Sequence, residues 1–490
     1  MLKIFSCVVV AASLYGQQSS VESEFNRVRN SPPELYAFLL KMPKGADLHN
    51  HLSGANYAES LVGAAAESGF CIDKRTLAIV KVCGPDLLEA ATANNNNADL
   101  NALIDKYSMR NFVPGRESAH DHFFDSFDLF SPVDSPHTGE FAAEVTRRAA
   151  DQNESYLELM AIAGSGAISA VGAKTGFDGN FETTAEKLRA AGLPEAVAAL
   201  KSRIDDIERV RLLQLHCETE PNSSPCKVLI RYVFQVLREF PKEQVFAQTL
   251  AGFQLATIDP RVVGVNFVQP EDGINSMRDY HLHMQMVDYA HKLYPNVHIT
   301  LHAGELTAGL VPPEGLRFHI REAVELGHAE RIGHGVDIMY ETGAAELLKE
   351  MRAKHVAVEV NLTSNDVILG VRGAEHPFPV YRKYGVPVVI STDDEGINRS
   401  HLTLEYQRAA LTYHLNYLEL KQIVRNSLEY SFLSGASYWT DATYRVPAKQ
   451  CQSGLVSKTC EEFMAGSDKA RAQVDLERRF RDFEAATIKK

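Results

Sequence analysis

The chain has 490 residues, of which 45% are hydrophobic and 23% charged, a composition typical of a globular protein with one large domain and appended segments. Its 50 basic and 63 acidic residues give a net charge of −13. This balance disfavours a nucleic-acid polymer or an anionic lipid surface as a partner but does not disfavour a small molecule.

The first 16 residues have the pattern of a signal peptide. Lys3 supplies a short positive region, and residues 4–14 form an apolar stretch too short to anchor the chain in a bilayer. We therefore expect cleavage after Gly16 and an exported protein, either periplasmic or secreted, with no membrane insertion after cleavage. The alternative is a buried N-terminal helix.

Removal of this leader leaves six cysteines in three local couples, Cys71 with Cys83, Cys217 with Cys226, and Cys451 with Cys460. An even number of cysteines beside an export signal suits an oxidising compartment. We predict three local disulfides, although six cysteines allow fifteen pairings and six buried thiols are the alternative.

Residues 17–42 are expected to form a leader helix, which ends before Pro43. Residues 43–440 are predicted to form the main domain, with a mostly helical insertion at about 56–150. Within it, Phe123, Phe124, Phe127 and Phe130 recur at helical spacing, which indicates a helix that packs on the domain or lines a pocket mouth. Residues 441–490 read as a cysteine-containing loop and a charged, solvated terminal helix.

Apolar runs and helical patterns alternate along the main domain, as in parallel strands joined by crossover helices. Helices are expected at about 186–210, 277–294, 318–326 and 341–354. The predicted fold is an α/β protein, a (β/α)8 TIM barrel with an N-terminal helical insertion and a C-terminal helical tail. Its eight candidate strands are residues 46–52, 156–162, 212–216, 262–268, 298–302, 331–333, 356–361 and 386–392.

Polar clusters lie at the ends of four of these strands, at residues 47–51 (DLHNH), 302–305 (HAGE), 333–335 (GHG) and 391–394 (STDD). The carboxyl ends of barrel strands meet at one face, so these clusters are predicted to converge. His49 and His51 are two apart on a strand and point to the same side. The pairs His120/His122 and His281/His283 lie in helical patterns and are interpreted as surface histidines.

His49, His51, His302 and Asp393 form a nitrogen-and-oxygen ligand set that suits one zinc ion with an open position for water. A water molecule held there becomes a nucleophile near neutral pH. Glu305 is placed to donate a proton, His334 to position or deprotonate the water, and Asp394 to accept a hydrogen bond from the substrate. Each residue alone could merely form hydrogen bonds with the backbone of a loop. Together they favour an active site.

These motifs resemble the adenosine deaminase family of the amidohydrolase superfamily. The resemblance covers residues 43–435 and rests on residues 42–52 (MPKGADLHNHL), 302–305 (HAGE), 331–335 (RIGHG) and 391–394 (STDD). With the export signal, it is greatest to the secreted, growth-factor-type branch or to bacterial exported relatives. It implies a (β/α)8 barrel with one zinc ion per subunit that hydrolyses adenosine, and 2′-deoxyadenosine, to the 6-oxo product and ammonia. By analogy with that branch, the helices of residues 56–150 could form a homodimer.

The family's roles transfer to this chain residue by residue. His49, His51, His302 and Asp393 would bind zinc, Glu305 would protonate the purine N1, His334 would orient the water, and Asp394 would hold the purine N7. The substrate pocket would further include His51, Ser53, Gln269 and Glu271. Ser53 stands where the family has an acidic residue for the ribose, and Gln269-Pro270 where it has a glycine, so the sugar end and strict adenosine preference stay open.

Three alternatives accompany this interpretation: a deaminase of a related 6-aminopurine such as a modified adenosine or adenine, a secreted interaction protein on a deaminase scaffold, and a different zinc-deaminase signature. The last is partly matched by His216-Cys217-Glu218 and Pro225-Cys226, but its second cysteine would fall on Leu229. That signature is therefore incomplete.

Overall fold

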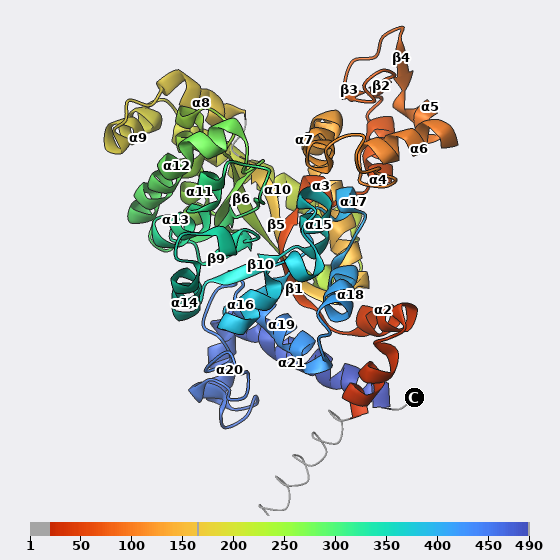
Figure 1. Cartoon of the computed structure of the whole chain (residues 1–490), viewed down its shortest axis with the longest axis vertical. Helices are drawn as coiled ribbons and strands as arrows, with labels where there is room; N and C mark the ends of the chain where they lie inside the picture. The colour runs from red at the N-terminus through yellow and green to blue at the C-terminus, as the bar shows by residue number, and fades with distance from the viewer. Residues whose placement is uncertain (1–19, 164–165, 489–490) are drawn as a thin grey trace, which may run out of the picture.

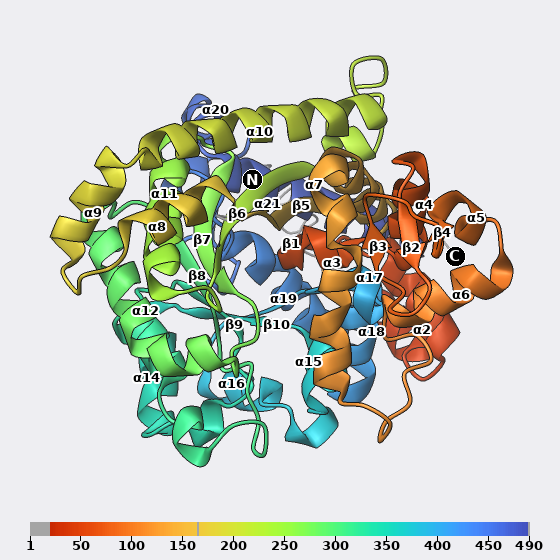
Figure 2. The same cartoon turned by 90° about the horizontal axis from the view of Figure 1, so that it is seen from above.

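The computed structural model describes residues 20–163 and 166–488, so the predicted signal peptide of residues 1–16 lies outside the described residues. Its centre is an eight-stranded parallel sheet in the order β1-β5-β6-β7-β8-β9-β10-β11, closed into a barrel by a bridge between Asn50 and Asp393 (Figures 1 and 2). The predicted TIM barrel is thereby confirmed. The strands are β1 (Gly45–His51), β5 (Glu154–Ala163), β6 (Leu229–Leu237), β7 (Val262–Val268), β8 (His298–Ala303), β9 (Arg331–His334), β10 (Ala357–Val360) and β11 (Val388–Ile390).

One predicted strand is wrong. Residues 212–216 are the last turn of helix α10 (Leu193–Gln214) and the turn that follows it, and the third strand of the barrel is β6. The apolar pair Leu212 and Leu213 is partly exposed, with 37% and 59% of its surface accessible, because it lies on the outer side of the helix end. The β6 segment was missed because Arg231 and Gln235 interrupt its apolar run.

The insertion after β1 is helical except for a small antiparallel sheet that was not predicted. It contains α3 (Leu52–Ala55), α4 (Ala58–Glu67), α5 (Ala90–Asn94), α6 (Asn97–Lys106) and α7 (Ala119–Asp151). The sheet, in the order β3-β2-β4, consists of β2 (Cys71–Asp73), β3 (Ile79–Val80) and β4 (Leu87–Glu89). Figure 1 shows it projecting from the barrel together with α5 and α6.

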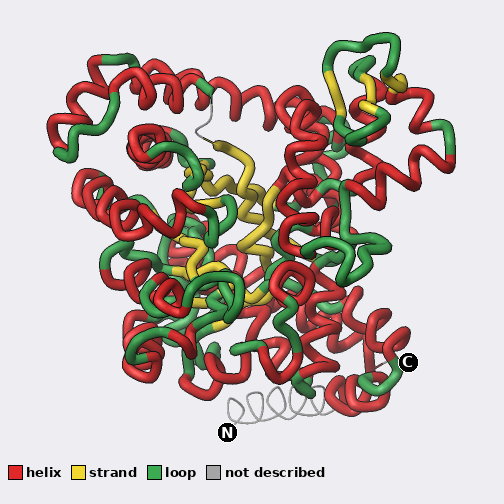
Figure 3. The backbone as a smooth tube through the Cα atoms, turned by 45° about the horizontal axis from the view of Figure 1, so that its top comes forward, coloured by secondary structure: helices red, strands yellow, loops and turns green. Residues whose placement is uncertain are grey.

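Helix α7 is the longest of the insertion and carries Pro132 and Pro136 in its interior. Each proline removes a backbone donor and disturbs the helix locally. Further along, α7 approaches α10 so closely that a Cβ on Gly139 would lie 2.5 Å from the Cβ of Val210. The two helices are therefore held together at this crossing. Figure 3 shows the helices arranged around the strands of the barrel.

The remaining helices surround the barrel and include the chain terminus. They are α2 (Pro32–Lys41), α8 (Ala167–Thr175), α9 (Phe181–Ala190), α11 (Lys242–Ile258), α12 (Ile274–Leu293), α13 (His319–Glu325), α14 (Ala344–Lys354), α15 (Leu362–Leu369), α16 (Phe378–Tyr384), α17 (Glu395–Asn398), α18 (Leu402–Thr412), α19 (Tyr417–Glu429), α20 (Lys458–Ala465) and α21 (Asp468–Ile488). None of the helices in the described part of the chain has the length and apolar character needed to cross a bilayer.

The terminal helix α21 is not the solvated appendage that its charge pattern indicated. It packs against α19 and β1 and buries Val474, Leu476 and Phe480. The apolar face was hidden in the sequence by the density of charged residues on the other side. All three predicted disulfides are present, Cys71–Cys83, Cys217–Cys226 and Cys451–Cys460.

Candidate active site

Four predicted metal ligands come together at the carboxyl ends of β1, β8 and β11. The Nε2 atom of His302 lies 3.1 Å from Nε2 of His49 and 3.1 Å from Nε2 of His51. The Oδ1 atom of Asp393 lies 3.2 Å and 3.3 Å from the same two histidine nitrogens. One ligand atom from each of the four residues thus falls in a cluster within 4.8 Å. Donor atoms that face one another at these separations can share one ion, since zinc–nitrogen bonds measure about 2.0–2.1 Å.

Each ligand is held in position by a second partner behind it. The Nδ1 atoms of the three histidines meet Glu359 (2.6 Å from His49), Gln235 (3.1 Å from His51) and Asn266 (3.0 Å from His302). The hydroxyl of Ser364 donates to Oδ2 of Asp393 at 2.6 Å. Such partners fix ring orientation and leave Nε2 facing the ion. The set therefore fits a metal site.

The electrostatics of the cluster also suit a cation. Burial lowers the pKa of His51 to about 4 and that of His302 well below its usual value, so both rings are neutral and have a free lone pair. Burial opposes ionisation of Asp393, but His334 and His49 outweigh it and hold the pKa of Asp393 well below its ordinary value. Asp393 is an anion at neutral pH, as a metal ligand must be.

Beneath the ligands, a buried arginine links two carboxylates. Arg331 Nε lies 2.5 Å from Oε1 of Glu359, and its Nη2 lies 2.5 Å from Oε2 of Glu158. The charge of Arg331, with the hydrogen bond of His49, overcomes the burial of Glu359 and lowers its pKa to about 2. Glu359 thus presents a permanent negative charge to His49, which neither motif nor spacing had indicated in the sequence.

Glu305 and His334 face each other beside the ligand cluster. The Nε2 atom of His334 lies 3.6 Å from Oε1 of Glu305 and 4.0 Å from Oδ2 of Asp393. Asn365 donates to Nδ1 of His334 at 2.8 Å, and Nε2 has no hydrogen-bond partner among the described residues. Burial lowers the pKa of His334 to about 3, so the ring is neutral. Because Nδ1 accepts from Asn365, the proton of the ring is on the free Nε2, which is a donor. Burial, reinforced by Asp393, raises the pKa of Glu305 well above its usual value, which keeps a proton on it.

Asp394 reaches the same cavity from the residue after the ligand Asp393. A Cβ on Gly54 would lie 1.7 Å from Oδ1 of Asp394, so only glycine at position 54 leaves room for this carboxylate. Burial, and then the charge of Asp393, raise the pKa of Asp394 well above its usual value. Both His334 and Asp393 have a positive φ, of 69° and 63°, which is uncommon outside glycine and typical of functional sites.

Of the three remaining predicted substrate contacts, two line the cavity and one does not. Ser53 and Gln269 line the cavity at the ligand cluster, as expected. Glu271 instead turns toward the loop after β8: its two carboxylate oxygens accept from the backbone N–H groups of Gly304 (2.9 Å) and Glu305 (2.8 Å), and Oε1 also meets His319 at 2.6 Å. Its position supports the backbone of Glu305 rather than a substrate.

The other His-x-His pairs lie away from the ligand cluster, but the expectation of surface histidines is wrong for His122 and His283. Both are buried, since their helix faces pack inward. His281 is exposed. His120 lies 2.9 Å from Asp272 and joins the start of α7 to the loop after β7.

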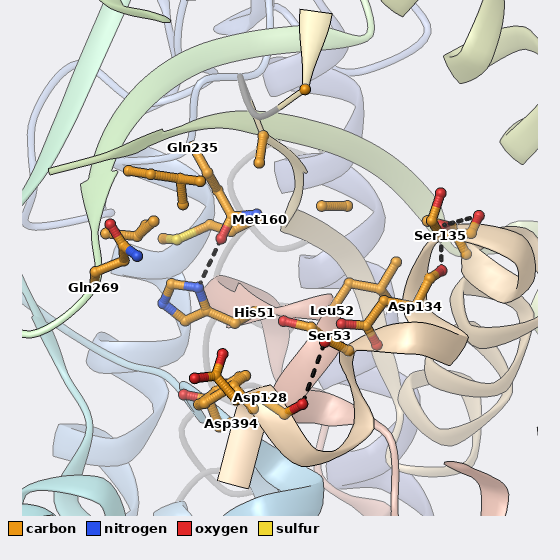
Figure 4. Close-up of a pocket in the computed structure, with 18 of the residues that line it drawn as sticks. His51, Leu52, Ser53, Asp128, Asp134, Ser135, Met160, Gln235, Gln269 and Asp394 are labelled. Carbon is orange, nitrogen blue, oxygen red and sulfur yellow. Dashed lines mark hydrogen bonds between the residues drawn. The ribbon is translucent and has the colours of Figure 1, made fainter. Parts of the chain in front are cut away.

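The ligand cluster opens into a cavity of about 950 Å³ that continues between α7, α8 and α10. Phe123, Phe124 and Phe127 line it, in agreement with the aromatic pattern, whereas Phe130 lies in the core. Sequence reasoning missed Met160, Gln235, Asp134 and Arg203, because each belongs to an element whose orientation only the fold determines. Figure 4 shows His51, Ser53, Gln235 and Asp394 around this cavity.

Comparison with known proteins agrees with this geometry. Residues 216–438 match the family model described as adenosine deaminase. An adenosine deaminase of Clostridium perfringens is 32% identical over 206 residues, which are 41% of this chain and 52% of that protein. One of Vibrio vulnificus is 22% identical over 81% of this chain and 96% of its own length. The chain thus spans about half the length of the first of these relatives.

Two solved structures share the fold. The N6-methyl-AMP deaminase of Arabidopsis thaliana superposes with a TM-score of 0.54 at 18% identity, over 81% of this chain and 94% of that one. An amidohydrolase of Burkholderia ambifaria with bound zinc gives a TM-score of 0.56 at 16% identity, over 92% of this chain and 94% of that one.

Proposed function

We propose that this chain, which belongs to the adenosine deaminase family, removes the 6-amino group of a purine nucleoside by hydrolysis, with adenosine and 2′-deoxyadenosine as its first candidates. The observation that carries the proposal is the convergence of three histidines and one aspartate within 4.8 Å, beside a buried glutamate that keeps its proton. That combination provides an ion site and an acid at one end of a cavity.

Each residue of the site has a separate role in the proposed reaction. His49, His51, His302 and Asp393 would hold a zinc ion, which suits this ligand set and supplies the Lewis acidity that lowers the pKa of a water molecule. His334 presents its free Nε2–H as a donor that orients the water against the purine C6. Protonated Glu305 donates to N1 as electron density moves onto the ring, and the amino group leaves as ammonia. Asp394 is protonated and donates a hydrogen bond to N7, which fixes the orientation of the ring.

Two other functions remain as competitors. A deaminase of a related 6-aminopurine would use the same groups, and the similarity to the N6-methyl-AMP deaminase supports that alternative. A secreted interaction protein on the same scaffold would need no chemistry, yet all seven proposed ligand and proton-transfer positions are filled by suitable residues. The intact site favours an enzyme.

Export of the protein is a further part of the proposal. Its support is the signal-peptide pattern of residues 1–16 together with three disulfides, which persist in oxidising compartments. Cell fractionation and N-terminal sequencing would test it, with a mature N-terminus at Gln17 expected. Homodimerisation through residues 56–150 stays a prediction, which light scattering would test.

Absorbance spectroscopy tests the activity. Wild-type protein and Glu305→Gln, both loaded with zinc, are incubated with adenosine, 2′-deoxyadenosine and adenine. The wild type is expected to convert one of these to the 6-oxo purine, and Glu305→Gln to bind equal zinc with little conversion. A zinc-loaded wild type that leaves all three unchanged would contradict adenosine-type deamination and favour a binding role.

A further inference from the structure

The cavity extends well beyond the ligand cluster. At about 950 Å³ it lies at the upper end of the range of about 300–1,000 Å³ that small-molecule sites occupy. His51, Glu305 and Asp394 line one end, and Thr138 and Arg203 line the other. A substrate that places its reacting ring at the first end therefore directs its other end past Ser53, toward α7 and α10.

The end of the cavity between α7 and α10, here called the compartment, contains a carboxyl oxygen that has no partner among the described residues. Asp134 lies on α7 between Pro132 and Pro136, and Figure 4 shows its side chain directed toward Leu52 and Ser53. Its Oδ1 is buried and has no hydrogen-bond partner within the described parts of the chain. Burial raises the pKa of Asp134 to about 7, against the opposing charge of Arg203. A buried polar atom without a partner is costly to the fold, so such an atom in a cavity points to a ligand.

One guanidinium faces the same space from α10. Arg203 Nη2 lies 3.5 Å from Oγ1 of Thr138, which donates to the backbone carbonyl of Asp134 at 2.7 Å. Among the residues that the structure describes, Arg203 forms no ion pair with a carboxylate. The close crossing of α7 and α10 at Gly139 holds the two helices, and hence these opposite charges, on adjoining walls.

The walls between the ligand cluster and these charges are largely apolar, with Phe127, Phe141 and Leu200 among the lining side chains. The compartment is therefore a passage with apolar side chains that leads to Asp134 and Arg203. A phosphate would meet Arg203 but also the carboxylates of Asp125, Asp128 and Asp134, which line the same cavity and repel it. An apolar group would leave both Asp134 and Arg203 without a partner. A zwitterion satisfies both charges.

We propose that the compartment between α7 and α10 binds the α-amino acid end of a 6-aminopurine nucleoside that is extended at its sugar by an apolar linker, with Asp134 pairing the ammonium and Arg203 the carboxylate. A guanidinium binds a carboxylate through two parallel hydrogen bonds, which gives this end its orientation. The inference rests on the proposed function, since it takes the purine to lie at the metal ligands.

Four adenosine compounds with different 5′ groups test it on the zinc-loaded protein: adenosine, 5′-methylthioadenosine (apolar), S-adenosyl-L-homocysteine (zwitterionic) and AMP (anionic). Deamination of S-adenosyl-L-homocysteine is expected to have the highest kcat/KM. The ratio that tests the site is kcat/KM for S-adenosyl-L-homocysteine divided by kcat/KM for 5′-methylthioadenosine. Asp134→Asn and the exposed Arg203→Gln are each expected to lower this ratio by about tenfold or more, the effect of losing one hydrogen bond to a charged group. Asp151→Asn, an exposed position at the end of α7, is the matched control and should leave the ratio unchanged.

The outcomes separate this inference from the proposed function. Preference for 5′-methylthioadenosine or adenosine, preference for AMP, or a ratio unaffected by both variants would each overturn the zwitterion site while leaving deamination intact. If no nucleoside reacts, the proposed function fails, and calorimetric titration with S-adenosyl-L-homocysteine decides the site: tight binding that Asp134→Asn weakens supports it, and absent or equal binding overturns it.

Discussion

Nδ1 of His49 lies 2.6 Å from Oε2 of Glu359, and both side chains are fully buried. The carboxylate fixes the orientation of the ring and directs Nε2 toward the other ligands. We predict that Glu359→Gln lowers zinc affinity by about 10–100-fold, the usual effect of removing such a partner. Competition with a chromophoric chelator measures it.

The matched control for Glu359→Gln is Glu346→Gln, since Glu346 is an exposed residue on α14. It makes the same chemical change away from the ligands and should leave zinc affinity as in the wild type. Equal affinity in Glu359→Gln and the control would show that His49 needs no carboxylate behind it.

Arg331 pairs with both Glu158 and Glu359 inside the barrel, and its guanidinium lies 3.7 Å from the centre of the Phe432 ring. Arg331→Gln would leave two buried carboxylates without their cation, so we predict that the free energy of unfolding falls by about 3–5 kcal/mol. Urea unfolding of the zinc-loaded protein measures it. Arg209→Gln removes an exposed pair with Asp206 and should change stability by less than about 0.5 kcal/mol. A similarly small loss in Arg331→Gln would contradict the prediction.

Activity should depend on pH through Glu305. Burial, followed by the charge of Asp393, raises the pKa of Glu305, and the protonated acid is the form that donates to the ring. The rate constant kcat is therefore expected to be maintained below that raised pKa and to fall as the pH increases through it. Stopped assays from pH 5 to pH 10 measure the profile. A kcat that rises steadily toward high pH would assign the donor role to another group.

The ligand set could be predicted because each member lies at the end of a strand that the sequence marks by a run of apolar residues. His49 and His302 lie near the ends of strands, and Asp393 just after one, whose positions the sequence indicated correctly, so their convergence followed from the barrel itself. The third strand was misplaced because a helix end, Leu212 to Leu215, is as apolar as a short strand. Local apolar content cannot separate the two.

The supporting residues could not be predicted because they depend on long-range placement. Glu359 lies 310 residues from His49 in the chain, and no spacing rule connects them. Glu271 was expected to contact substrate, but the fold turns its carboxylate toward the backbone of Glu305. No motif or spacing singled out Asp134, and only the crossing of α7 with α10 reveals that its carboxyl faces a cavity.

The Cys71–Cys83 disulfide joins β2 to the segment after β3 and closes a loop with a sequence separation of 12 residues. On the chain-entropy account a loop of this size is stabilised by roughly 3 kcal/mol, which is all the more important for three short strands that share little core. We predict that replacing both cysteines by serine lowers hydrogen-exchange protection of residues 70–90 by about a hundredfold, because local opening becomes easier.

Zinc content and kcat of this variant should equal those of the wild type, since no residue of the small sheet lines the cavity. The Cys451→Ser/Cys460→Ser variant is the control, and it should leave exchange in residues 70–90 unchanged. Unaltered protection in the first variant would mean that packing of β3 on α7 holds the sheet without the bond.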